Sequence, residues 1–298
     1  MSPCIAAASQ WAAWIGREEV RTDVVDAGHA ARWLAMLDRA APDDGTLPQG
    51  FHWCLCLPSA PTASLGPDGH PRRDDPAAGF LPPLPQPRRM WASSKVEFLT
   101  PLRAGQTIER TSKVHSITEK DGGSGTLVFV DLAHETLAGG ALAVREVQTL
   151  VFRDAPPAGA PLVPPAPGQA RFDRAAWDAC RTLTPTEPLL LRFSALTFNS
   201  HRIHYDLPYA QTREGYRGLV VHGPLTATLL LGLASRELGD NRLRSFTFRG
   251  LSPAICGEAL HLALRGNAAG YELGAFAAGG RQVMSATAAL AGSPPARG

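Results

Sequence analysis

The sequence predicts an α+β protein made of two similar units, each with a helical segment followed by four antiparallel strands. Strand-like segments separated by turns fill residues 91–152 and again residues 244–290. Between them, residues 155–170 (APPAGAPLVPPAPGQA) consist mainly of Pro, Ala and Gly and form the clearest boundary in the chain. The second unit also contains an apolar helical segment from Leu225 to Leu238. These observations predict two sheet-forming units joined by an extended linker.

Length and composition agree with a globular protein of two domains. The chain has 298 residues, of which 44% are hydrophobic and 19% charged. We place the domains at residues 1–155 and 171–298, with a linker at 156–170. The net charge of +2 is too small to predict a nucleic-acid partner, and no apolar run is long enough to span a membrane. Five cysteines, an odd number, do not form a disulfide framework, so we expect a cytoplasmic protein.

The first unit begins with a helical region at residues 10–40. Its clearer part is Ala27 to Leu37, where apolar residues recur at helical spacing. The apolar segment Phe51 to Leu57 is either a short strand or the body of a poorly formed central helix. Four strands follow, at Ser94–Phe98, Gln106–Ile117, Gly125–Thr136 and Ala143–Phe152.

Residues 58–89 form a long segment with many prolines and no useful periodicity. Such a stretch within a compact domain is unusual and is often functional. It is either a surface loop braced by prolines or a lid that presents basic residues, Arg88 and Arg89 among them, to an anionic substrate.

The second unit repeats this plan. We expect a short helix within Phe172–Arg181 and a strand at Leu189–Phe198, followed by the polar cluster Asn199–Asp206 and the apolar helix. The remaining strands are predicted at Arg244–Arg249, Glu258–Arg265, Tyr271–Ala277 and Gln282–Leu290.

The polar cluster has the composition of a catalytic centre. Asn199 and His204 are five residues apart, so they would face opposite sides of a strand and lie about 140° apart on a helix. The chain between them must therefore turn if both are to face one reactant. His222, Gly223 and Pro224 begin the apolar helix, whose free N–H groups would stabilise a developing negative charge.

These motifs resemble a known family. The segment NSHRIH at 199–204 occupies the place of Asp-x-Asn-Pro-Leu/Ile-His in the (R)-specific enoyl-CoA hydratases of the MaoC family, and VVHGPLTATLL at 220–230 resembles the start of their long helix. The chain is more similar to the type 2 hydroxyacyl-thioester dehydratase branch, which includes 3-methylfumaryl-CoA (mesaconyl-C4-CoA) hydratases and carries an FNxHRIHYD signature. The resemblance extends over the chain, through WIGREE at 14–19, GFLPPLPQPRRMWA at 79–92 and SGTLVFVDLAHE at 124–135.

The resemblance implies two tandem hot-dog units, each an antiparallel sheet wrapped around a central helix, with chemistry only in the second. It also implies His204 as general base and acid, and the N–H groups of Gly223 and Leu225 as the oxyanion site. Asn199 stands where the single-domain relatives have Asp, and an amide cannot exchange a proton at neutral pH. Either His204 acts with Asn199 as a positioner of water, or Asp206 is the second acid–base group.

The expected activity is the reversible hydration of an enoyl-CoA, with 3-methylfumaryl-CoA as the best specific substrate. The alternatives are a hot-dog thioesterase and a non-catalytic acyl-CoA-binding subunit. We expect no cofactor, and no metal site at His201, His204 and His222, because no nearby carboxylate pattern supports one. His222, Leu225, Arg88 and Arg89 are the predicted substrate-binding residues. A homodimer is one option for the assembly.

Overall fold

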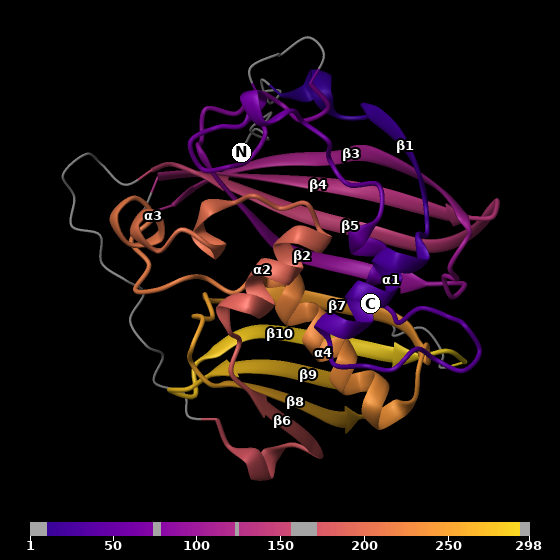
Figure 1. The fold of residues 1–298 in the computed structure, drawn as a ribbon. Helices are drawn as coiled ribbons and strands as arrows, with labels where there is room; N and C mark the ends of the chain where they lie inside the picture. Colours follow the sequence, from indigo (N-terminus) through magenta and orange to yellow (C-terminus); the bar gives the residue numbers. More distant parts are fainter. Residues whose placement is uncertain (1–10, 74–78, 123–124, 156–171, 293–298) are drawn as a thin grey trace, which may run out of the picture.

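A computed structural model of the chain describes residues 11–73, 79–122, 125–155 and 172–292. These residues form a ten-stranded antiparallel sheet in the order β1-β3-β4-β5-β2-β7-β10-β9-β8-β6, with the main helices against one face (Figure 1). The predicted linker at 156–170 lies outside the described residues, so the domain boundaries stay a prediction.

The first half contributes five strands and one α-helix. Helix α1 (Ala27–Met36) starts at Asp26, whose side chain accepts a hydrogen bond from the His29 N–H, as an N-cap does. The strands are β1 (Glu18–Val24), β2 (Arg88–Phe98), β3 (Thr107–Gly122), β4 (Gly125–Ala138) and β5 (Ala141–Arg153). The four predicted strands of this half are therefore confirmed, and each is longer than expected.

The second half repeats the order of strand, helix and four strands. Its helices are α2 (Glu187–Leu196), α3 (Leu207–Thr212) and α4 (Gly223–Leu238), and its strands are β6 (Ala179–Leu183), β7 (Leu243–Gly250), β8 (Leu260–Asn267), β9 (Gly270–Ala277) and β10 (Gln282–Leu290). The halves meet where β2 pairs antiparallel with β7, from Ser93 opposite Arg249 to Glu97 opposite Ser245. One continuous sheet thus carries both halves.

Helix α4 is the central packing element of the second half. It lies across β8, β9 and β10 and also reaches β2 of the first half (Figure 1). Leu225, Leu230 and Leu233 are almost fully buried along it. Burying a leucine side chain contributes about 1.5–3 kcal/mol, so this helix anchors the shared core. The predicted apolar helix is confirmed, beginning at Gly223.

The segment predicted as a strand at Leu189–Phe198 is instead helix α2. Its buried residues Leu190, Phe193 and Ser194 follow helical spacing, whereas Leu191 is largely exposed. Pro188 lies in the first turn, where a missing N–H costs nothing. Three consecutive leucines hide this period in the sequence, which explains the wrong prediction.

Two further expectations were wrong at the edges of the sheet. The helix expected at Ala27–Leu37 is confirmed as α1, but residues 11–24 contain a 3₁₀ turn at Ala12–Trp14 and strand β1 where helix was expected. Residues 172–183 likewise contain a 3₁₀ turn followed by strand β6. Both are edge strands in which no residue is fully buried, so the apolar signal in the sequence is weak. The open choice at Phe51–Leu57 resolves as a 3₁₀ helix at Phe51–Cys54.

Among the described residues, no helix is long and apolar enough to cross a membrane.

Candidate active site

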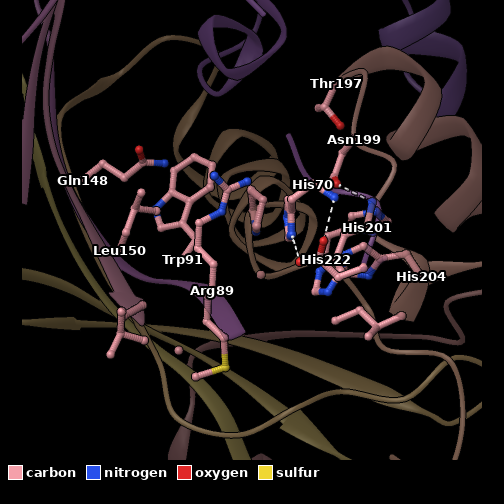
Figure 2. Close-up of a pocket in the computed structure, with 18 of the residues that line it drawn as sticks. His70, Arg89, Trp91, Gln148, Leu150, Thr197, Asn199, His201, His204 and His222 are labelled. Carbon is pink, nitrogen blue, oxygen red and sulfur yellow. Dashed lines mark hydrogen bonds and ion pairs between the residues drawn. The ribbon is translucent and has the colours of Figure 1, made fainter. Parts of the chain in front are cut away.

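A cavity of about 1870 Å³ lies where the two halves meet. Its walls come from strand β2 and the loop at 58–73 in the first half, and from the polar turn and the start of α4 in the second half. Figure 2 shows Trp91, Gln148 and Leu150 on one side of it and four histidines on the other. Both halves therefore build this site.

The polar turn is set by the way in which α2 ends. Phe198 adopts a left-handed backbone conformation with φ of 47°, and the Asn199 N–H donates to the Ser194 carbonyl at 2.8 Å. These two features close the helix in a Schellman-type cap. The chain then turns into a 3₁₀ helix at Arg202–His204, which places His204 in the interior of the protein. The predicted turn between Asn199 and His204 is confirmed.

His204 presents one ring nitrogen to the cavity. Its Nδ1 lies 2.7 Å from the Val220 carbonyl oxygen, which can only accept, so Nδ1 carries the proton. Nε2 is consequently the unprotonated nitrogen, and no described residue hydrogen bonds to it. Burial lowers the pKa of His204 to about 4, so the ring is neutral at pH 7.

The ring of His222 packs against the ring of His204. The two imidazole rings are stacked, with centroids 3.5 Å apart and planes 20° apart. His222 is almost fully buried, and its Nε2 lies 2.8 Å from the Ser194 hydroxyl. Burial, together with His204 and His201, lowers the pKa of His222 well below its usual value. His222 thus lines the cavity but is fixed by protein contacts.

The other predicted residues of the polar turn and of the start of α4 differ in whether they line the cavity. Asn199 and Gly223 both line the cavity, and a Cβ on Gly223 would lie 3.8 Å from the Trp91 carbonyl oxygen. Leu225 does not line it, because its side chain is fully buried in the core. The Asn199 side-chain oxygen accepts a hydrogen bond from the His201 N–H at 3.0 Å.

Asp206 lies outside the cavity. One of its oxygens accepts from the Tyr209 N–H at 3.0 Å and caps α3, and the other accepts from the Arg202 guanidinium at 2.7 Å. Asp206 is absent from the cavity walls. The Tyr209 hydrogen bond and Arg202 lower the pKa of Asp206, which keeps it ionised. The structure does not bring Asp206 to Asn199 and His204 in the cavity.

Arg88 and Arg89 line the same cavity but differ in their partners. Arg88 forms an ion pair with Glu214 at 3.0 Å and donates to the Arg213 carbonyl at 2.9 Å. The Arg89 guanidinium extends between Trp91 and the histidines, and no described side chain forms an ion pair with it (Figure 2). Burial and the nearby Arg73 lower the pKa of Arg89 to about 10, so it remains a cation at neutral pH.

Comparisons with known proteins give the family. Residues 50–256 match the hydroxyacyl-thioester dehydratase type 2 family. Mesaconyl-C(4)-CoA hydratase of Chloroflexus aurantiacus is 42% identical over 95% of this chain and 99% of its own length. The chain belongs to this dehydratase family. Its members are hydro-lyases, so the chain is an enzyme that reversibly adds water to the double bond of an enoyl thioester.

Solved structures show the same fold at low sequence identity. A MaoC-like dehydratase from Phytophthora capsici has a TM-score of 0.67 and 16% identity, covering 94% of this chain and 97% of its own. A Mycobacterium tuberculosis protein described as a double hotdog fold has a TM-score of 0.53 and 19% identity over 93% of this chain and 96% of its own. The predicted double hot-dog architecture is confirmed.

This dehydratase also has site residues that the sequence did not single out. Asp68 and His70, from the loop at 58–73, line the cavity beside the polar turn. The ring Nδ1 of His70 lies 2.8 Å from one Asp68 carboxylate oxygen, and the backbone N–H of His70 donates to the other oxygen at 3.0 Å. Although burial raises the pKa of Asp68, these hydrogen bonds lower it to about 2. The only sequence signal was an Asp and a His among turn-forming residues in a long loop.

The loop is held against the polar turn by close backbone contacts. A Cβ on Gly69, whose φ is 88°, would lie 1.9 Å from the Ser200 carbonyl oxygen. The Ser200 hydroxyl donates to the Gly69 carbonyl at 2.6 Å, and the Arg202 N–H donates to the Asp68 carbonyl at 2.9 Å. Only glycine fits at position 69 without displacing the loop.

His201 completes this side of the cavity. Its ring centroid lies 4.2 Å from that of His70 and 5.4 Å from that of His204. Burial, His70 and His204 lower the pKa of His201 to about 2. Asp68, His70 and His201 offer ligand atoms within 4.8 Å of one another. Because the Asp68 oxygens are already hydrogen bonded to His70, we interpret the group as a carboxylate–imidazole pair beside a neutral histidine.

Proposed function

We propose that this enzyme adds water to the double bond of a short 2-enoyl-CoA whose acyl chain carries a carboxylate, as in 3-methylfumaryl-CoA. The observation that supports it most is the unprotonated Nε2 of His204, which faces a cavity that also contains the start of α4 and Arg89, a cation that forms no ion pair with any described side chain. A base, an oxyanion site and a buried cation are the three groups that such a substrate requires. The name of the Chloroflexus relative supports the same substrate class.

His204 acts as the general base. As the water oxygen bonds to Cβ, one water proton moves to Nε2 of His204, and the electrons of the double bond move toward the thioester oxygen. The carbonyl of Val220 accepts from Nδ1–H and stabilises the imidazolium that forms. The N–H groups at the start of α4, beginning with Gly223, face the oxygen on which negative charge collects.

Asn199 positions the water. Its side-chain oxygen is held by the His201 N–H, and its amide cannot take a proton at neutral pH. Of the two accounts that the sequence leaves open, the geometry favours the one in which Asn199 is a positioner. Asp206 instead fixes Arg202, whose guanidinium also donates to the Pro67 carbonyl at 2.9 Å and so holds the loop.

Arg89 binds the acyl carboxylate. Its matched control is Arg88, the adjacent residue whose charge is neutralised by Glu214. The variant Arg89→Ala should raise KM at least tenfold for a carboxylated enoyl-CoA and leave KM for crotonyl-CoA nearly unchanged, because only the former has a charge to lose. Arg88→Ala should change neither value by this factor. An equal rise for both substrates would instead place Arg89 at the CoA phosphates.

The activity is tested with a panel of enoyl-CoA thioesters that includes mesaconyl-C4-CoA. Loss of the absorbance of the conjugated thioester without release of thiol is the expected result. Release of free thiol would indicate a thioesterase, for which the cavity would need a carboxylate aimed at the thioester carbon. Binding without turnover of any thioester would indicate the acyl-CoA-binding subunit and would overturn the proposal.

We place the enzyme in the cytoplasm, acting without a cofactor. The four described cysteines are free thiols, two of them buried, which is typical of a reducing compartment. Every group in the proposed step belongs to the chain itself, so adding metal ions or nucleotides should not raise the rate. A homodimer stays a prediction, which sedimentation of the purified protein would test.

A further inference from the structure

Hydration needs two proton transfers, and the proposed residues account for only one. A proton leaves water as the C–O bond forms, and a proton must reach Cα as the enolate collapses. Asn199 cannot carry the second proton, and Asp206 is ionised and outside the cavity. The site described so far therefore lacks a second acid–base group.

His70 has the surroundings of such a group. Among the described histidines that line the cavity, at 70, 134, 201, 204 and 222, it is the one that is hydrogen bonded to a carboxylate. Asp68 accepts from Nδ1–H, which leaves Nε2 as the nitrogen that exchanges protons, and no described residue hydrogen bonds to Nε2. A carboxylate behind an imidazole orients the ring and stabilises its protonated form, as in catalytic triads.

The position of His70 is fixed from the other half of the molecule. Contacts between Gly69 and Ser200, and between Asp68 and Arg202, attach its loop directly to the polar turn that carries His204. His201 lies between the two imidazoles and contacts both rings. His70 and His204 thus lie on the same side of the cavity, with the ring of His201 between them.

We propose that His70, oriented by Asp68, is the second acid–base group of the reaction. This inference rests on the proposed hydratase function and adds a residue from the first half to a site assigned to the second. The single-domain relatives have a carboxylate at the position of Asn199. In this chain Asp68 supplies the carboxylate, and it acts through His70.

His204 takes one proton from water while the oxygen lone pair bonds to Cβ and the double-bond electrons form the enolate. The His70 imidazolium then gives its Nε2 proton to Cα as the enolate electrons form the new C–H bond. The proton on His204 returns to His70 through solvent, so that one water is consumed and both histidines regain their first state. In dehydration each step runs in reverse.

The charges around His70 come from three segments. Asp68 and Arg73 belong to its own loop, Arg89 comes from β2, and the neutral His201 comes from the polar turn. Burial and Arg89 lower the pKa of His70, whereas Asp68 raises it. A carboxylated substrate bound at Arg89 would offset the repulsion from that guanidinium and favour protonation of His70. The second group thus becomes active when the substrate is in place.

The test compares His70→Gln, Asp68→Asn and wild type in the hydration of the best enoyl-CoA, with His261→Gln on the distant strand β8 as the control. We expect His70→Gln to lower kcat about 10²- to 10³-fold, Asp68→Asn to lower it less, and His261→Gln to leave it unchanged. In wild type, kcat should fall as pH rises through the pKa of His70, which burial and Arg89 hold below its ordinary value of 6.5, because His70 then loses its proton. His70→Gln should remove this fall in kcat, which a purely structural defect would leave in place.

Two results would overturn the inference alone. One is that wild type is active and that His70→Gln has the same kcat and the same fall in kcat at higher pH. The other is loss of wild-type activity on treatment with a chelator, with recovery on adding a divalent cation, because Asp68, His70 and His201 would then be holding a metal ion. No hydration by wild type would overturn the proposed function itself, and the inference with it.

Discussion

The turn after α1 and the turn after α2 have the same backbone and opposite roles. Both helices end with a left-handed residue, Asp38 with φ of 52° and Phe198 with φ of 47°. In both, the next N–H closes the cap onto a carbonyl five residues earlier, Arg39 onto Leu34 at 3.0 Å and Asn199 onto Ser194 at 2.8 Å. The two halves thus repeat this local structure closely.

The two turns differ in the contacts that their side chains make. Arg39 donates to Asp240 at 2.6 Å and to Ser235 at 3.0 Å, so the first turn fastens the end of α4. Asn199 instead lines the cavity at the beginning of the same helix. One copy of the turn is a structural anchor, and the other carries the proposed site. The repeated backbone thus gives a place for a site, while the residues on it decide whether one exists.

The largest expected effect separates the residues within the second turn. His204→Ala should lower kcat about 10³- to 10⁴-fold because it removes the general base. Asn199→Ala should lower kcat far less, and Asn199→Asp should retain measurable activity because it restores the residue of the single-domain relatives. Steady-state hydration rates of the three variants test this. Equal losses in His204→Ala and Asn199→Ala would mean that Asn199 does more than hold water.

Acid should destabilise the second half through its buried histidines. Folded His204 is protonated only below about pH 4, whereas the unfolded side chain is protonated below its ordinary value of 6.5. Between these values the unfolded chain binds more protons, so the free energy of unfolding falls as pH is lowered. The full shift corresponds to about 3 kcal/mol.

Urea unfolding at pH 7 and pH 5 measures this dependence on pH. The loss of stability between the two values should be smaller in His204→Gln than in wild type. His261→Gln should lose as much as wild type does. An equal loss in both variants would show that His204 does not contribute.

The contact between the loop at 58–73 and the polar turn after α2 is tested by a substitution at Gly69. Gly69→Ala would place Cβ against the Ser200 carbonyl and shift His70 relative to His204. A displacement of about 1 Å at a reacting group can cost roughly 10²-fold in rate, and we expect a loss of this size in kcat. Gly105→Ala is a matched control, since Gly105 has a φ of 84° but nothing within 4 Å of its Cβ position. Equal kcat in both variants would contradict the docking account.

The smallest effect is expected at Asp206. Asp206→Asn keeps a side chain that can cap α3 and removes only the charge that pairs with Arg202, which is partly exposed. The free energy of unfolding should change only slightly, and kcat should stay within a few-fold of wild type. Loss of turnover in a folded Asp206→Asn protein would restore Asp206 as the second acid–base group and would exclude His70.

Local patterns in the sequence predicted much of the fold. The apolar segment at 225–238, eight of the strands and the turn between Asn199 and His204 follow from hydrophobic period, turn residues and spacing. The edge strands β1 and β6 were not predicted because neither contains a fully buried residue, which leaves little apolar signal. Helix α2 was misread because its run of leucines fits both periods.

The site was predictable only where its residues are neighbours in the chain. His204, Asn199 and Gly223 could be grouped because a turn and a helix start lie close together in sequence. Asp68 and His70 reach them through contacts between residues about 130 positions apart, such as Ser200 with Gly69. No spacing rule shows where a long loop docks, and no pattern in the sequence distinguishes Arg88 from Arg89.

The proposed mechanism depends on an unprotonated Nε2 of His204 in the cavity, and NMR of the ¹⁵N-labelled histidines tests this most directly. The signal of His204, assigned by its loss in His204→Gln, should show the tautomer with the proton on Nδ1. It should remain neutral as pH is lowered until about pH 4. A proton on Nε2 at neutral pH, or titration of His204 near its ordinary value of 6.5, would contradict the account.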